Sequence, residues 1–248
     1  MDLADQVEIH DAVYVERVVA YLDILGFEKM VDASATDGRF VRKIAEFVKW
    51  ASELLGPPSR AALKAQFGDT RVLSQFSDSF AVSCDSTAEQ ILHLLECLQI
   101  AQIDAIGYGL TLRGGVCKGP LLHEHDNKGT VLLFGPAINR AHELENVPGS
   151  NPRIVIDDSL ADEIGSMANP RFQGMLARDQ SDRIRYINYL KIDPILERTI
   201  KIGFNEKGAH YHDFEEYKEA VETLVHKHID DDSKIAKKYM WMQGELYR

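Results

Sequence analysis

One stretch near the start decides the fold of this 248-residue chain: Val15-Glu16-Arg17-Val18-Val19-Ala20-Tyr21-Leu22-Asp23-Ile24-Leu25-Gly26-Phe27. Its apolar first part predicts a buried strand over 15–22, and Asp23 ends that strand with a carboxylate. Gly26 predicts a tight turn into a helix, whose first backbone N–H groups would point toward an anion. The run therefore joins a core strand to a place where charged ligands can bind.

Outward from this run, hydrophobic spacing predicts further helices and strands. Helices are expected where apolar residues recur every three or four positions, and strands where short apolar runs are bounded by turn residues. The expected helices span 39–55, 87–106 with Thr87 as N-cap, 136–145, 214–229 and 234–247. The expected strands span 70–76, 80–83, 110–118, 130–134, 153–156 and 183–190. This order predicts an α+β domain with a mostly antiparallel sheet and helices on one face.

The amino-acid composition of the chain changes near Pro194, where charged segments with helical spacing begin. We expect a catalytic domain at 1–193 and a helical C-terminal extension at 194–248, which packs on that domain or on a partner subunit.

The composition narrows the class of protein. With 28 Lys and Arg against 39 Asp and Glu, the formal net charge is −11. Binding to a nucleic-acid backbone usually requires an excess of positive charge. No apolar run is long enough for a membrane helix, and the acidic start at 1–5 lacks the features of a signal peptide. We expect a cytoplasmic protein that binds neither nucleic acid nor a membrane.

Asp23 and Asp78 carry the candidate chemistry. Asp78 lies in Phe76-Ser77-Asp78-Ser79-Phe80, where one short strand turns back into the next. Two carboxylates at adjoining strand ends can converge on Mg²⁺ or Mn²⁺, which prefer oxygen ligands. Taken singly, each aspartate is more typical of a turn or a helix cap. The pair is what predicts a metal site.

Four segments, in order over roughly residues 15–190, resemble the class III nucleotidyl cyclases. They are Asp-Ile-Leu-Gly-Phe at 23–27, Asp78 at its hairpin, Leu-Arg-Gly-Gly-Val-Cys-Lys-Gly at 112–119, and Phe-Gly-Pro-Ala-Ile-Asn-Arg-Ala-His-Glu-Leu-Glu at 134–145. The resemblance implies a ferredoxin-like βαββαβ core. It also implies a homodimer with active sites between the subunits, and cyclisation of a nucleoside triphosphate.

The same resemblance implies roles for individual residues. Asp23, Asp78 and the main-chain carbonyl of Ile24 would hold two Mn²⁺ or Mg²⁺ ions. The remaining positions would contact the nucleotide: the Leu25, Gly26 and Phe27 backbone the phosphates, Asn139 the ribose, and Arg183 or Arg185 the triphosphate. Trp50 could stack on the base, although core packing is the more common role of such a residue.

The chain differs from the cyclases that it resembles at the residues that recognise the base and at the residue that stabilises the transition state. Ser74 and Leu132 stand where adenylate cyclases read adenine with a Lys and with an Asp or Thr, and the guanine-reading Glu and Cys are absent too. Glu143 stands at the position of the transition-state arginine, and Arg140, one helical turn earlier, could substitute for it. The departures leave a changed active site or an inactive one.

The bacterial Pycsar pyrimidine cyclases are the branch that the chain resembles. The similarity lies in size, in Phe-Ser-Asp-Ser at 76–79, in Gly-Pro-Ala-Ile-Asn-Arg-Ala at 135–141, and in the helical tail at 238–241. It implies that UTP, or with less support CTP, becomes a 3′,5′-cyclic nucleotide that activates a separate effector in anti-phage defence.

Two alternatives stay open: a degenerate cyclase that binds nucleotide without turnover, and a palm-like polymerase or diguanylate-forming enzyme. The second lacks a Gly-Gly-Asp-Glu-Phe-type turn.

Overall fold

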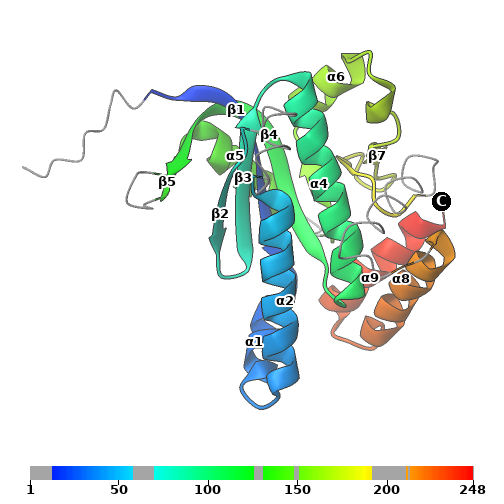
Figure 1. Cartoon of the computed structure of the whole chain (residues 1–248). Helices are drawn as coiled ribbons and strands as arrows, with labels where there is room; N and C mark the ends of the chain where they lie inside the picture. Colours follow the sequence, from blue (N-terminus) through cyan, green and yellow to red (C-terminus); the bar gives the residue numbers. More distant parts are fainter. Residues whose placement is uncertain are drawn as a thin grey trace, which may run out of the picture.

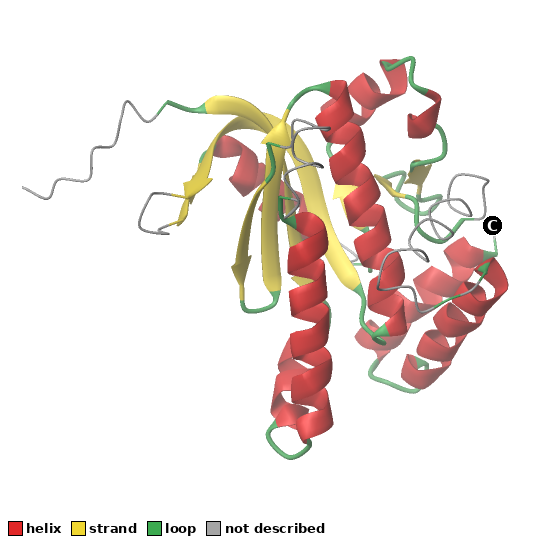
Figure 2. Ribbon diagram, in the orientation of Figure 1, coloured by secondary structure: helices red, strands yellow, loops and turns green. Residues whose placement is uncertain are grey.

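A single mixed sheet organises the chain (Figures 1 and 2). The computed structural model describes residues 13–57, 70–125, 131–147, 151–191, 211 and 213–247. Within them the strands follow the order β2-β3-β1-β4-β6-β8-β7, and β5 pairs with β4 off this path. The domain boundary expected between residues 193 and 194 lies outside the described residues.

The first half of the chain forms a ferredoxin-like βαββαβ unit. Strand β1 pairs antiparallel with both β3 and β4, and β2 and β3 form an antiparallel hairpin. The elements are β1 (Val15–Ile24), α1 (Phe27–Ser34), α2 (Gly38–Leu55), β2 (Val72–Phe76), β3 (Ser79–Asp85), α4 (Ala88–Gly107) and β4 (Leu112–His125). The predicted α+β class with a mainly antiparallel sheet is confirmed.

The second half widens the sheet and adds helices. Strand β6 runs parallel to β4, and β8 pairs antiparallel with β6 and with β7. The elements are β5 (Val131–Phe134), α5 (Pro136–Glu145), β6 (Ile154–Ile156), α6 (Asp158–Ser166), the 3₁₀ turn η1 (Pro170–Phe172), β7 (Leu176–Arg178), β8 (Arg185–Ile187), α8 (Phe214–His228) and α9 (Ser233–Leu246).

Several boundaries differ from the sequence prediction. The strand expected over 183–190 is only Arg185–Ile187, because Arg183 adopts a positive φ of 67° in the turn before it. Strand β4 continues to His125, well beyond the strand expected over 110–118. Helix α6 and strand β7 were not predicted from the sequence.

Helices cover both faces of the sheet. Along β1, Val18 and Ala20 pack into the core beneath α2 and α4, whereas Val19 faces α5 on the other side. Burial on both faces explains why β1 reads as a continuous apolar run and not as an alternating one. The expectation that the helices share one face is therefore wrong for α5.

The C-terminal helices α8 and α9 pack on each other and on the end of α4, where Ile103 and Ile106 join their apolar cluster. Polar contacts fasten α9 to the outer strands. The Trp241 indole N–H donates to Asp179 at 2.6 Å, and the Tyr186 hydroxyl donates to Glu245 at 2.6 Å. In the described part of the chain, no helix is both long and apolar enough to cross a bilayer.

Gly115 sets how closely α5 approaches the sheet. A Cβ atom at this position would lie 2.1 Å from the Ala141 carbonyl oxygen and 2.5 Å from the Leu144 Cβ. Such contacts are impossible, so only glycine lets α5 rest directly on β4. Gly119, four residues along the same strand, has room for a Cβ at 3.5 Å from the Ala137 Cβ.

We expect Gly115→Ala to lower the free energy of unfolding by about 1–3 kcal/mol, the usual cost of overpacking a core. Urea denaturation followed by circular dichroism measures it. Gly119→Ala is the matched control and should be close to neutral. Equal stability of the two variants would contradict the close approach of α5 to β4.

Candidate metal and nucleotide site

Asp23 and Asp78 meet at neighbouring strand ends. Asp23 lies opposite Ser79 in the β1–β3 register, and Asp78 immediately precedes Ser79. Ser77 turns the hairpin with a positive φ of 54°, and the Ile24 N–H donates to the Asp78 carbonyl at 3.2 Å. The two carboxyl groups are close enough for the charge of Asp78 to raise the pKa of Asp23. The structure thus brings together the side chains that the sequence assigned to metal binding.

The electrostatics of this pair favour a cation. Burial raises the pKa of Asp23, the Arg113 guanidinium opposes that rise, and the neighbouring Asp78 carboxylate adds to it. Two carboxylates this close repel each other when both are ionised. A divalent ion between them would replace that repulsion with attraction.

Arg113 is a site residue whose individual contacts sequence reasoning did not predict. It lies opposite Asp23 in the β1–β4 register, and its Nε and Nη2 lie 2.9 and 2.8 Å from Asp23 Oδ2. Its Nε also lies 2.6 Å from the carboxylate of Glu145, which is only 3% exposed at the end of α5. An arginine inside an apolar strand needs buried partners, and that was the available signal.

The turn after β1 lies beside the carboxylate pair. The Leu25 N–H donates to the Thr111 carbonyl at 2.9 Å, which fixes the turn against the start of β4. Gly26 caps α1 with a φ of 77° and without a side-chain hydrogen bond, so no side chain caps the first N–H groups of the helix. Phe27 begins the helix and packs on the core. Leu25, Gly26 and Phe27 therefore adjoin Asp23 as expected.

Asn139 and Arg140 lie elsewhere, on the exposed side of α5. Asn139 is exposed. Arg140 bonds to Asp157 at 2.9 Å and to Glu143 at 3.3 Å, so its guanidinium is engaged within its own surroundings. Glu143, where the sequence resemblance leads one to expect an arginine, is thus the partner of Arg140.

Ser74 has a partner of its own, and Leu132 lies far from the carboxylates. The buried Ser74 hydroxyl is hydrogen-bonded to His123 at 2.8 Å, and burial lowers the pKa of His123 to about 4. Leu132 pairs with Glu124 near the far end of β4, whereas Arg113 at the near end pairs with Asp23. At about 3.3 Å per residue, this separation is roughly 35 Å along the strand.

The remaining predicted residues have local partners. The Arg183 N–H donates to the Asp179 carbonyl at 2.9 Å in its turn. Arg185 bonds to Asp158 at 2.8 Å and to Asp162 at 2.6 Å, both on α6. The Trp50 ring lies 6.0 Å from Phe47 and 6.3 Å from Tyr108, against the core under α2. One chain therefore does not gather all the predicted nucleotide contacts.

The donor set at the strand ends fits a hard divalent cation. No cluster of three or more His, Cys, Asp or Glu side chains suitable for a metal occurs among the described residues, so the site rests on two carboxylates and main-chain oxygens. Mg²⁺ is commonly held by one or two carboxylates, with water and substrate phosphates completing its shell. Asp23, Asp78 and the Ile24 carbonyl match that requirement.

Comparisons with known proteins give the following. No family model matches the sequence, and no curated protein is significantly similar to it. Among solved structures, the adenylyl cyclase CyaB from P. aeruginosa aligns at 12% identity with a TM-score of 0.49, over 71% of this chain and 94% of that one. The guanylate cyclase domain of RhGC from Catenaria anguillulae in complex with GTP aligns at 14% identity and 0.45, over 71% and 97%. A bacterial light-regulated adenylyl cyclase aligns at 15% identity and 0.45, over 76% and 97%.

We expect Arg113→Met to leave the Asp23 and Glu145 carboxylates without the guanidinium group that pairs with both. The free energy of unfolding at pH 8 should fall by about 2–3 kcal/mol, because two partly buried charges lose their counter-ion. Without Arg113 the folded-state pKa values of both acids rise further above their unfolded values. The deficit is therefore greatest at high pH and shrinks as the pH falls toward 5 and the acids become protonated.

Denaturant titrations at several pH values measure this deficit. Arg171→Met, which breaks the exposed ion pair with Glu96, is the control and should cost well under about 1 kcal/mol at every pH. A pH-independent loss in Arg113→Met would contradict the assignment.

Proposed function

We propose that this protein is a nucleotide cyclase that converts UTP, or less favourably CTP, to the 3′,5′-cyclic nucleotide and diphosphate. The observation that carries the proposal is the meeting of Asp23 and Asp78 beside the Leu25–Gly26 turn. A paired carboxylate site next to uncapped helix N–H groups suits a substrate with both metal-bound and free phosphate oxygens.

Asp23, Asp78 and the Ile24 carbonyl would hold two Mn²⁺ or Mg²⁺ ions, which when bound make the ribose 3′-hydroxyl more acidic and neutralise charge on the leaving diphosphate. The chain's own groups orient the triphosphate. The N–H groups that begin α1 at Gly26 and Phe27 donate to phosphate oxygens. Arg113 fixes the orientation of the Asp23 carboxylate through its contacts with Oδ2.

We further propose a homodimer in which each site draws residues from both chains. The carboxylates lie at one end of β4, whereas Leu132 lies near its other end and Asn139 is exposed on α5. Apolar side chains that a partner could cover are exposed near Leu132. Tyr14 and Phe134 are each 47% exposed, and their rings lie 6.0 Å apart.

The preference for a pyrimidine base rests on the residues that replace the purine-reading ones. Ser74 is short, buried and hydrogen-bonded to His123, and Leu132 has no polar group. Neither side chain can therefore place a positive or negative charge against the base. The cyclic product would activate a separate effector, as in anti-phage signalling. This biological role follows from the Pycsar resemblance alone.

One observation favours the alternative of a cyclase-fold protein that binds nucleotide without turnover. Glu143 occupies the family's arginine position, and Arg140 is bonded to both Glu143 and Asp157. The two functions differ in whether diphosphate is released.

With Mn²⁺ and each of the four nucleoside triphosphates in turn, we expect cyclic UMP to be the main product by mass spectrometry. Asp78→Asn should reduce the rate at least about a hundredfold, because it removes charge that stabilises the transition state. It should keep the melting temperature, because it also relieves repulsion at Asp23. Glu53→Gln, on the exposed side of α2, is the control and should be fully active. Binding of nucleotide without any cyclic product would favour the alternative.

Mixing two inactive variants tests the shared site. Asp78→Asn removes a carboxylate and Asn139→Ala removes the proposed ribose contact, so each homodimer should be inactive. In a mixed dimer one site carries both changes and the other carries neither. After subunit exchange, about a quarter of wild-type activity should return, since about half of the dimers are mixed and each has one intact site of two. No recovery despite demonstrated exchange would overturn the interfacial site.

A further inference from the structure

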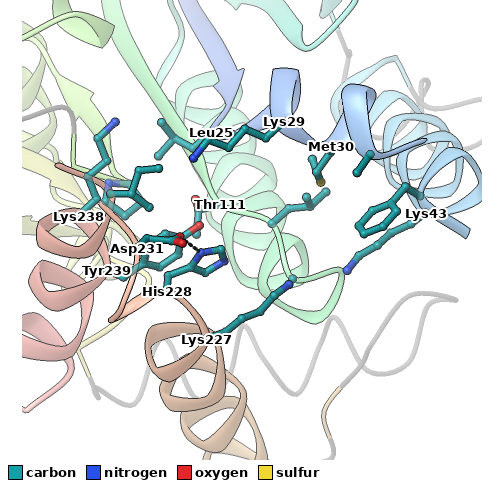
Figure 3. A pocket seen from close by; sticks show the side chains of 17 residues that line it. Leu25, Lys29, Met30, Lys43, Thr111, Lys227, His228, Asp231, Lys238 and Tyr239 are labelled. Carbon is teal, nitrogen blue, oxygen red and sulfur yellow. Dashed lines mark hydrogen bonds and ion pairs between the residues drawn. The ribbon is translucent and has the colours of Figure 1, made fainter. Parts of the chain in front are cut away.

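A cavity of about 260 Å³ lies between the C-terminal helices and the first half of the fold. Its walls come from α1, the start of α2, the α4–β4 turn, α8 and α9. Figure 3 shows four lysines around it, one from each of these helices: Lys29, Lys43, Lys227 and Lys238. No sequence-predicted role accounts for these four residues.

Lys43 and Lys227 approach each other across the cavity, and their ammonium groups point toward one another in Figure 3. Burial lowers the pKa of Lys43, and the charge of Lys227 lowers it further. The Lys43 Nζ lies 3.0 Å from where a Cβ on Gly109 would be, so it rests on the turn backbone. Within the described residues, neither lysine has a carboxylate partner in an ion pair. Two like charges held together in this way favour an anion between them.

At the other end, Lys238 lies near the metal site. Burial and the charge of Arg113 lower the pKa of Lys238, and the Asp23 and Glu145 carboxylates partly oppose that effect. Leu25 and Gly26, the turn beside Asp23, form part of the same cavity wall. The cavity therefore adjoins the proposed phosphate site.

Among the described residues that line the cavity, only Asp231 supplies a carboxylate, and that carboxylate is already hydrogen-bonded. It is hydrogen-bonded to His228 at 2.6 Å, and the His228 ring stacks on Tyr239 at 4.2 Å. Four lysines and one aspartate give the described lining a formal charge of 4 − 1 = +3, although the whole chain has a formal net charge of −11 when histidines are left out of the count. A concentrated positive charge in an acidic protein marks an anion site.

We infer that this cavity binds a small polyphosphate anion, either free diphosphate or the terminal phosphates of a nucleotide. The charge of the lining suits a multiply charged anion, and the volume is below the roughly 300 Å³ at which pockets for drug-sized ligands begin. Diphosphate as the source rests on the proposed function, because it is the leaving group of that reaction. Binding itself does not require turnover. An anion there would join α8 and α9 to α1 and α2.

Calorimetric titration of the full chain in EDTA tests the inference, with sodium pyrophosphate, UDP and sodium sulfate as probes. We expect pyrophosphate to bind and its affinity to fall as salt is added. The double variant Lys43→Met/Lys227→Met should bind at least about tenfold more weakly, because two charged hydrogen-bond donors are lost. It should be at least as stable as the wild type, since a repulsion is removed. Lys49→Met/Lys237→Met, two exposed lysines on α2 and α9, is the matched control and should bind normally.

Asp78→Asn in EDTA separates this inference from the proposed cyclase. Pyrophosphate binding that persists in Asp78→Asn and is lost in the lysine variant supports the cavity, whether or not the protein has cyclase activity. Binding that is lost in Asp78→Asn but persists in the lysine variant would place the anion at the metal site and overturn the inference. Equal affinity for sulfate would also overturn it. Binding of UDP as tight as that of pyrophosphate identifies a nucleotide tail, and binding of pyrophosphate alone identifies free diphosphate.

Discussion

The register of β1 between β3 and β4 is the constraint on which the site depends. It sets Asp23 opposite Ser79 on one side and Arg113 on the other. A slip by one residue would turn Asp23 to the opposite face and carry Val18 and Ala20 out of the core. The burial of those side chains therefore holds the carboxylate in position. The chemistry at the strand end is fixed by hydrophobic packing several residues away.

The convergence of Asp23 and Asp78 could be predicted because it follows from strand ends and a hairpin, which are local features. Arg113 with Glu145 could not be predicted in the same way. Their contact exists only because α5 crosses β4 at Gly115, and that approach depends on tertiary packing. Helix α5 itself was predicted within its exact bounds, but the face that it covers was not.

Ser74 and Arg185 show a second limit of sequence reasoning. Ser74 was assigned to the nucleotide, but its hydroxyl bonds to His123, because β4 runs on to His125 and brings that histidine under the sheet. Arg185 was assigned to the triphosphate, but two aspartates of the unpredicted helix α6 hold it. In both cases the competing partner comes from an element or an extension that local periodicity did not reveal. A polar side chain's role depends on all the neighbours that the fold supplies.

The position of the C-terminal helices ties the lysine-lined cavity to the carboxylate site. Helix α9 is anchored by Trp241 on Asp179 and by Glu245 on Tyr186, so Lys238 has a fixed place relative to the sheet. In that position its pKa is lowered by burial and by the charge of Arg113 and raised by the charge of Asp23. A divalent cation at the carboxylates adds positive charge near Lys238, and a polyphosphate in the cavity adds negative charge. Because the two ligands are opposite in sign and adjoin the same residue, each should favour the other's binding, and by linkage the effect is reciprocal. In the proposed anion site, helices α8 and α9 would contribute to binding in addition to covering the end of α4.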